Sequence, residues 1–200
     1  MSNASALLVI DVQNDFCEGG ALAVQDGSKV VAPINQLMRG FETIAFSQDW
    51  HPKDHQSFAS QHENMQPYDV VEMPYGPQVL WPEHCVQGSN GAQFHNALHT
   101  ERAHMIIRKG FRAPIDSYSA FSENDHTTVT GLDGYLKSRN ITSVTLCGLA
   151  LDFCVNYTAL DARKLGYQVT VETKACRAID LNGSLEAAMS AMKNAGVILN

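Results

Sequence analysis

Residues 143–166, SVTLCGLALDFCVNYTALDARKLG, decide the fold because they join an apolar run to a helical pattern through a short polar break. The run from Ser143 to Leu149 is short and partly β-branched, which is typical of a buried strand in a parallel sheet. Beyond the break, apolar residues recur at helical spacing until Gly166, a suitable C-cap. Cys154 is therefore predicted in the first turn of a helix, where the helix dipole would lower the pKa of its thiol.

The same alternation of strands and helices extends along the chain. Further strands are predicted at residues 6–10, 43–47, 105–108, 168–171 and 197–199, and helices at 28–39, 94–98, 130–140 and 185–192. This order predicts an α/β fold, a three-layer, Rossmann-like sandwich with a six-stranded, mainly parallel sheet covered by helices on both faces. We expect one domain over residues 1–200, with a long excursion at about 50–104 that shapes a site.

Composition narrows the range of partners. The 200 residues carry a net charge of -7 and no basic run, which argues against nucleic acid or an anionic membrane as partner. A small-molecule substrate is the default expectation. The five cysteines are odd in number and widely scattered, so we expect reduced thiols and a cytoplasmic location.

Chemically useful side chains follow four of the predicted strands. Asp11, Asp49 and Lys109 stand at or just beyond the ends of three strands, and Cys154 follows the fourth. Ligands of parallel α/β sheets bind beyond the carboxyl ends of the strands. We therefore expect these four side chains to meet at one edge of the sheet, together with His51.

A cysteine nucleophile needs a base that takes its proton and later returns it to the leaving group. Asp11 is the candidate base, and Lys109 would favour the ionised forms of both the thiol and the carboxylate. Each residue also has an ordinary interpretation. Cys154 could be a small buried hydrophobe, Asp11 a carboxylate that caps a loop, and Lys109 a solvated charge.

The segment Asp49-Trp50-His51 suggests a metal site. In an extended segment, residues two apart point the same way, so the carboxylate and the imidazole could share an ion. His84 is our choice for the third ligand, and Cys85 competes with it. Two histidines and one carboxylate suit zinc, iron or manganese and do not discriminate sharply among them. The alternative interpretation is a solvated, histidine-rich loop.

Three aromatic residues are candidates for the walls of a flat pocket. Phe16 follows the Asp11 loop, Trp81 precedes His84, and Tyr118 lies beyond Lys109. Aromatic side chains commonly line ligand pockets, although core packing is their usual role.

Several ordered motifs make the sequence similar to the nicotinamidases, within the isochorismatase-like cysteine hydrolases. The resemblance covers the chain from Leu7 to about Leu199. The motifs are DVQNDF at 11–16, DWHP at 49–52, SFA at 57–59, WPEHCVQG at 81–88, KG at 109–110 and GLALDFCV at 148–155.

The resemblance implies an amidase that deamidates nicotinamide to nicotinate and ammonia through a cysteine thioester, in NAD salvage, and that also accepts pyrazinamide. Asp11, Lys109 and Cys154 match the catalytic positions. The oxyanion would be held by the backbone N–H groups of Ala150 and Cys154. The resemblance also implies a cis peptide between Leu149 and Ala150, a rare form for a non-proline residue.

The resemblance further implies one divalent metal, most naturally zinc, that anchors the pyridine nitrogen. Asp49, His51 and His84 match the metal positions. A homo-oligomer is also compatible with the sequence. Other readings compete with this one. They are a related amidohydrolase with a carbamoyl or other amide substrate, a vinyl-ether hydrolase, a hydrolase whose metal-bound water attacks, and a non-catalytic metal-binding domain.

Overall fold

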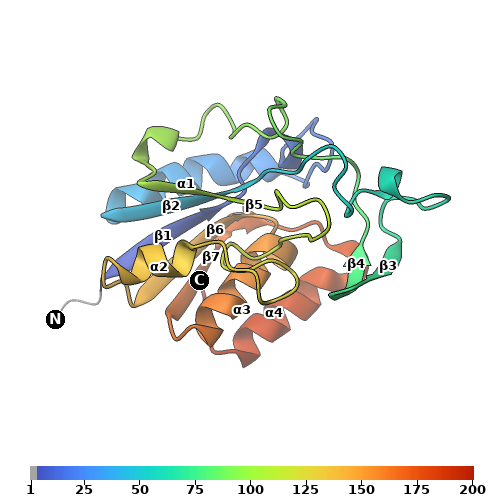
Figure 1. The fold of residues 1–200 in the computed structure, drawn as a ribbon. Coiled ribbons are helices and arrows are strands. Elements are labelled where there is room, and N and C mark those ends of the chain that lie inside the picture. The colour runs from blue at the N-terminus through green and yellow to red at the C-terminus, as the bar shows by residue number, and fades with distance from the viewer. Residues whose placement is uncertain (1–3) are drawn as a thin grey trace.

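A six-stranded parallel sheet forms the centre of the computed structural model, which describes residues 4–200 (Figure 1). The strand order is β5-β2-β1-β6-β7-β8, and each neighbouring pair is parallel. The strands are β1 (Ser5–Ile10), β2 (Thr43–Asp49), β5 (Met105–Lys109), β6 (Ser143–Leu149), β7 (Gln168–Arg177) and β8 (Ile198–Leu199). All six predicted strands are therefore confirmed, as is the parallel sheet.

Apolar, β-branched composition explains why the central strands form where they do. In β1, every residue after Ser5 is buried, and the two flanking strands β2 and β6 are buried along most of their length. A strand buried on both faces needs the continuous apolar run that the sequence supplies. The strands β1, β2 and β6 thus form the core that fixes the sheet edge behind the site.

Four helices cover the two faces of the sheet. Helix α1 lies on one face, whereas the other three lie on the opposite face (Figure 1). The helices are α1 (Val31–Leu37), α2 (Leu132–Lys137), α3 (Asn156–Lys164) and α4 (Ser184–Asn194). The predicted three-layer sandwich is confirmed.

Two predicted helices differ in detail from the structure. The segment predicted at 28–39 is divided into the 3-10 turn Gly27–Val30, helix α1 and the 3-10 turn Met38–Gly40. The helix predicted at 130–140 is shorter, and its N-cap is Gly131 rather than the predicted Thr130. Thr130 Oγ1, one residue earlier, accepts a hydrogen bond from the Leu132 N–H at 3.2 Å.

The short helix predicted at 94–98 is wrong. Its residues form turns, because the Leu98 N–H donates to the His95 carbonyl and the His95 N–H donates to Val12 in the Asp11 loop. The rest of the 50–104 excursion contains a hairpin that sequence periodicity did not reveal. Its strands are β3 (Val70–Met73) and β4 (Gly76–Val79), which pair antiparallel apart from the main sheet.

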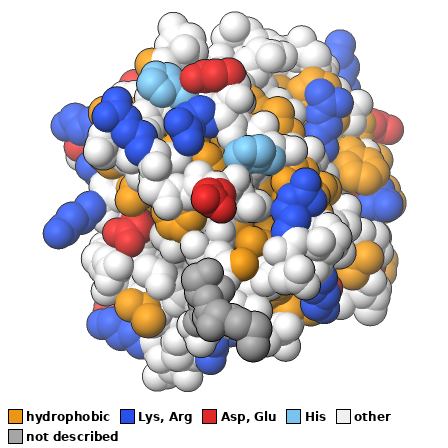
Figure 2. Space-filling model, turned by 90° about the vertical axis from the view of Figure 1, so that its left-hand side faces the viewer, with side chains coloured by type: hydrophobic (Ala, Val, Ile, Leu, Met, Phe, Trp, Pro, Cys, Tyr) orange, Lys and Arg blue, Asp and Glu red, His pale blue; other side chains and the backbone are white. Residues whose placement is uncertain are grey.

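The surface carries mixed charge. On the face drawn in Figure 2, basic, acidic and hydrophobic side chains are interspersed. Within residues 4–200, no helix has both the length and the apolar character that crossing a membrane requires.

Candidate active site

The ends of four neighbouring strands bring the predicted catalytic side chains together. Asp11 directly follows β1, Asp49 and Lys109 are the last residues of the paired strands β2 and β5, and Cys154 lies beyond β6. The register pairs Asp49 with Lys109 across the sheet. Their convergence confirms the expectation drawn from the strand-end rule.

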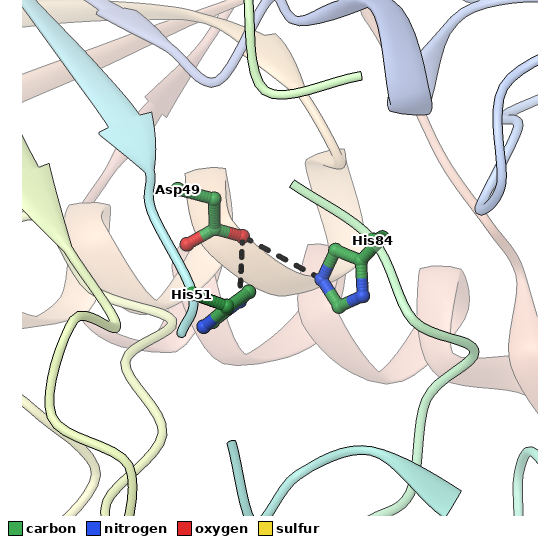
Figure 3. A group of neighbouring side chains, drawn as sticks. All are labelled: Asp49, His51 and His84. Atoms are coloured by element: carbon green, nitrogen blue, oxygen red, sulfur yellow. Dashed lines mark ion pairs between the residues drawn. The ribbon is translucent and has the colours of Figure 1, made fainter. Parts of the chain in front are cut away.

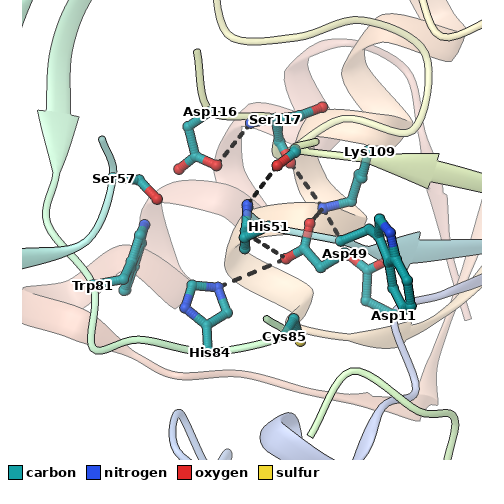
Figure 4. Close-up of polar contacts among 12 residues, drawn as sticks. Asp11, Asp49, His51, Ser57, Trp81, His84, Cys85, Lys109, Asp116 and Ser117 are labelled. Carbon is teal, nitrogen blue, oxygen red and sulfur yellow. Dashed lines mark hydrogen bonds and ion pairs between the residues drawn. The ribbon is translucent and has the colours of Figure 1, made fainter. Parts of the chain in front are cut away.

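Lys109 is the hub of this cluster (Figure 4). Its side chain is fully buried, and its Nζ lies 2.9 Å from Asp11 Oδ2, 2.5 Å from Asp49 Oδ1 and 3.5 Å from Cys154 Sγ. It also donates to the Ser117 carbonyl oxygen at 2.8 Å. A buried ammonium is tolerated only when it is paired, and here two carboxylates pair with it.

The protonation states of the cluster follow from burial and from these pairs. Burial by itself would lower the pKa of Lys109, but Asp11 and Asp49 outweigh burial and raise that pKa well above its usual range. Burial raises the pKa of Asp11, and Lys109 opposes the rise. Lys109 is therefore charged, and the Asp11 carboxylate is a stronger base than an exposed aspartate.

The expected lowering of the Cys154 pKa is not found. The thiol is buried, and burial raises its pKa well above the usual range, although Lys109 acts in the opposite direction. The helix terminus does not compensate for the loss of water around the sulfur. The resting group is therefore a neutral thiol, which would require a base in order to act as a nucleophile.

Asp11 is placed to be that base. A carboxylate oxygen of Asp11 lies within 4.8 Å of Cys154 Sγ. Ser47 Oγ donates to Asp11 Oδ1 at 2.7 Å, and the other oxygen, Oδ2, faces Lys109. One oxygen is thus fixed by Ser47 and the second is directed toward the thiol and the ammonium.

The predicted metal ligands form a second cluster beside the first (Figure 3). Asp49, His51 and His84 are buried, and one ligand atom of each lies within 4.8 Å of the other two. Asp49 Oδ2 is 3.6 Å from His51 Nε2 and 3.8 Å from His84 Nε2. The three groups therefore converge on a single point.

The two histidines are held in the tautomer that a metal site requires. His51 Nδ1 donates to the Gly110 carbonyl oxygen at 2.8 Å, and His84 Nδ1 donates to the Pro82 carbonyl oxygen at 2.8 Å. With the proton on Nδ1, each Nε2 presents a lone pair. The residues present thus fit a divalent cation of the zinc type.

Cys85, the competing ligand candidate, and the neighbouring His55 lie outside this set of three ligands. His55 is buried beside His51, with ring centroids 4.2 Å apart, and its nitrogens contact Ser57 Oγ and the Ile115 carbonyl oxygen. Burial lowers the pKa of His55 to about 4, so it is neutral. Among residues 4–200, the potential metal-binding cluster of Asp49 and His51 has His84, and not Cys85, as its third member.

A pocket opens onto both clusters and has an empty volume of about 320 Å³. Phe16, Trp81 and Tyr118, the three predicted aromatic residues, all line it together with Cys154 and His84. Trp81 Nε1 donates to the Tyr118 hydroxyl oxygen at 3.2 Å, which joins two walls. The pocket is therefore aromatic on its sides and polar where the thiol and the metal ligands lie.

Sequence reasoning missed further residues of the pocket wall, namely Leu22, Asp116, Phe153 and Ile179. Asp116 is buried and accepts hydrogen bonds from Gln78 Nε2 and the Ser117 N–H, both at 2.8 Å. Phe153 could have been found, because it directly precedes the nucleophile. The hydrogen bond from Gln78 comes from the unpredicted hairpin, and no local pattern signals it.

The turn that carries Cys154 is wider than an α-helical turn. Residues Leu151–Val155 form one turn of π-helix, and the Ala150 carbonyl oxygen accepts hydrogen bonds from the N–H groups of Phe153 and Val155. The predicted cis peptide between Leu149 and Ala150 is present. Widened turns of this kind are frequent at functional sites.

Comparison with known proteins agrees with this geometry. The family described as "Isochorismatase domain" matches residues 5–199. The nicotinamidase of Acinetobacter baylyi is 54% identical over 98% of this chain and 92% of its own.

Two solved structures are similar over nearly their whole length. The nicotinamidase/pyrazinamidase of Acinetobacter baumannii has a TM-score of 0.97 at 54% identity, and the match covers 100% of this chain and 96% of that one. The pyrazinamidase of Pyrococcus horikoshii in complex with zinc has a TM-score of 0.79 at 33% identity, and the match covers 98% of each chain. These matches confirm the resemblance to nicotinamidases, and the chain belongs to the isochorismatase domain family.

Proposed function

We propose that this chain is a nicotinamidase that hydrolyses nicotinamide to nicotinate and ammonia, and that it also accepts pyrazinamide. The observation that carries the proposal is the contact of one buried ammonium, on Lys109, with both the Asp11 carboxylate and the Cys154 thiol. This arrangement opens into an aromatic pocket that also presents the metal ligands. The nicotinamidases among its relatives support the choice of substrate.

In the first half of the reaction, Asp11 takes the proton of the Cys154 thiol while the sulfur attacks the amide carbon. The base is strong enough because burial raises the pKa of Asp11. Asp11 then passes the proton to the amide nitrogen, the carbon–nitrogen bond breaks, and ammonia leaves. The acyl group remains on sulfur as a thioester.

In the second half, a water molecule attacks the thioester carbon. Asp11 removes one proton from the water and returns it to the departing sulfur, which restores the neutral thiol and releases nicotinic acid. The acid then loses its remaining proton to solvent and becomes nicotinate. Throughout both halves, Lys109 stays charged and opposes the negative charge that builds up beside it. Its contacts with two carboxylates support this role.

The oxyanion of each tetrahedral intermediate would be held by the backbone N–H groups of Ala150 and Cys154. Cys154 belongs to the widened turn after β6, Ala150 directly precedes that turn, and both residues line the pocket. Backbone donors fixed by a rigid turn need no reorganisation when charge develops on the substrate oxygen.

Asp49, His51 and His84 would hold a divalent cation, most naturally zinc. The ion would supply a Lewis-acid anchor for the pyridine nitrogen. Two of these ligands, Asp49 and His84, line the same pocket as Cys154, and the zinc complex of the related pyrazinamidase supports the choice of metal. Phe16 and Trp81 would pack against the ring, so that its amide group faces Cys154.

The setting of the reaction is pyridine-nucleotide salvage. All five cysteines are free, which supports the cytoplasmic location expected from the sequence.

Ammonia release from nicotinamide by the purified, metal-loaded protein is the direct test. Cys154→Ala should abolish release and leave the metal content unchanged, because the sulfur does not belong to the metal cluster of Asp49, His51 and His84. Cys176→Ala, which removes another buried thiol, is the matched control and should retain activity. Turnover by Cys154→Ala would instead favour attack by metal-bound water. A wild-type protein that releases ammonia only from other amides would identify a related amidohydrolase.

A further inference from the structure

Asp152, two residues before the nucleophile, makes contacts that the reaction as described does not use. Its carboxylate is buried and accepts three hydrogen bonds, all from one segment. Oδ1 accepts from the Ile179 N–H at 3.0 Å, and Oδ2 accepts from the Asp180 N–H at 2.7 Å and from Ser184 Oγ at 2.5 Å. One carboxylate therefore accepts hydrogen bonds from both ends of the connection between β7 and α4.

This connection forms one wall of the pocket. Ile179 lines the pocket that Phe16 and Cys154 also line, and it is packed against the hydrophobic core. The backbone around it is irregular, because Asp180 and Asn182 have φ angles of +57° and +51°. Apart from the single 3-10 turn Leu181–Gly183, no strand or helix ladder fixes residues 178–183, so their position depends largely on side-chain acceptors.

Asp152 also belongs to the π-helical turn Leu151–Val155 that presents Cys154. It follows that the nucleophile and the Ile179 wall are joined through a single side chain. The connection is stronger than a usual side-chain contact, because hydrogen bonds to an ionised acceptor exceed those between neutral groups.

We propose that Asp152 is a positioning residue, which holds Ile179 at a fixed distance from Cys154 and so sets the width of the pocket for a planar ring amide. This inference rests on the proposed function for its substrate. Asp152 does not touch the reacting atoms. It acts through Ile179, whose side chain contacts the bound ring.

Asp152→Asn tests the proposal with little change in volume. Three donors meet two oxygens, so replacing either oxygen with an NH₂ group leaves at least one donor facing another donor. We expect KM for nicotinamide to rise about tenfold, with a much smaller change in kcat, because loss of a charge-assisted hydrogen bond costs roughly that factor.

The matched control is Asp161→Asn on α3. Asp161 is also a buried carboxylate, and it accepts from Ser122 Oγ at 2.8 Å and from Lys164 Nζ at 3.0 Å, outside the pocket. Both Asn variants should lower the melting temperature, but only Asp152→Asn should raise KM. Equal KM values for the two variants would reduce Asp152 to a structural anchor and overturn the proposal.

A double-mutant cycle with Ile179→Ala identifies the path of the effect. If Asp152 acts through Ile179, the changes in KM caused by the two substitutions are not additive. Additive changes would mean that Asp152 acts elsewhere and would overturn the proposal.

Should Asp152→Asn fail to fold, Ser184→Ala removes one of the three donors and leaves the carboxylate. It should then raise KM by a smaller factor, and an unchanged KM would count against the proposal.

A last measurement does not depend on the substrate. The ratio of the labelling rates of Cys154 by N-ethylmaleimide and by iodoacetamide reports pocket width, because the bulkier reagent needs more room. The ratio should rise in Asp152→Asn and stay constant in Asp161→Asn. If the wild-type protein released no ammonia from nicotinamide, the proposed function would fail. The labelling ratio would still decide whether Asp152 positions the wall.

Discussion

One carboxylate oxygen of Asp49 contacts Lys109, and the other faces the two histidines of the metal cluster. Its Oδ1 lies 2.5 Å from Lys109 Nζ, while its Oδ2 faces His51 and His84. The catalytic cluster and the metal cluster therefore share one carboxylate. A substitution in one cluster should therefore change the properties of the other, because the effects of substitutions at contacting charges are rarely additive.

Replacement of Lys109 with Met should lower kcat for nicotinamide by about 100-fold or more, the usual cost of removing a preorganised electrostatic group. It should also destabilise the fold by about 3–5 kcal/mol, because Asp11 and Asp49 are left as buried charges without their partner. Ammonia release and denaturant unfolding measure the two effects. Arg108→Met is the control, because Arg108 stacks on Trp50 outside the pocket. Normal kcat in Lys109→Met would contradict the assigned role.

Loss of a metal ligand should separate metal binding from folding. His84→Ala should weaken zinc binding by more than the roughly 10–100-fold that changes to second-shell partners cost. The melting temperature of the metal-free protein should change little by comparison. Zinc content after dialysis and a zinc titration of activity are the measurements, with His104→Ala as a control outside the cluster. Full zinc content in His84→Ala would exclude this residue as a ligand.

Ser47→Ala should move the acid limb of the pH profile. Burial raises the pKa of Asp11, whereas the hydrogen bond from Ser47 favours the ionised carboxylate and lowers that pKa. Removing the hydroxyl should raise the Asp11 pKa further, because the ionised carboxylate loses a hydrogen bond that favours it. Asp11 must be ionised to accept the proton, so activity should be lost at a higher pH as the solution is acidified. The measurement is kcat/KM against pH, and an unmoved acid limb would argue against Asp11 as the base.

Gly148→Ala should be strongly destabilising. Gly148 has a φ of +123°, and a Cβ there would overlap the Ile10 carbonyl oxygen on the neighbouring strand. We expect a loss of at least about 2 kcal/mol in the free energy of unfolding from the backbone conformation alone. Gly134→Ala provides the contrast, because Gly134 lies in α2 with open space around it and should gain about 1 kcal/mol. Similar unfolding curves for the two variants would contradict this account.

The central sheet and the catalytic cluster were predictable because they depend on local patterns. Apolar runs mark the strands, and polar residues at their ends mark the site, so Asp11, Asp49, Lys109 and Cys154 could be placed together before any coordinates. Ser47 carried a comparable signal. It is a hydroxyl within the otherwise apolar first part of β2, two residues before Asp49, and in a strand it points the same way.

Other features depend on contacts between distant segments. The β3–β4 hairpin has no clear alternation, and its Gln78 reaches Asp116 across 38 residues of sequence. The turns at 94–98 depend on backbone bonds to the Asp11 loop, which outweigh a weak helical pattern. The Cys154 pKa was wrong in direction because burial is a tertiary property, whereas the helix terminus is a local one.

The position of β5 at the edge of the sheet affects how firmly the backbone of Lys109 is held. This strand is at the end of the strand order and pairs only with β2, and its Ile106 is 47% exposed. Peptide groups on the unpaired side of an edge strand exchange with deuterium through small local openings, while those of the central strands await global unfolding. Lys109 terminates this weakly protected strand, so its two carboxylate partners, rather than the sheet, keep the ammonium in place when the edge frays.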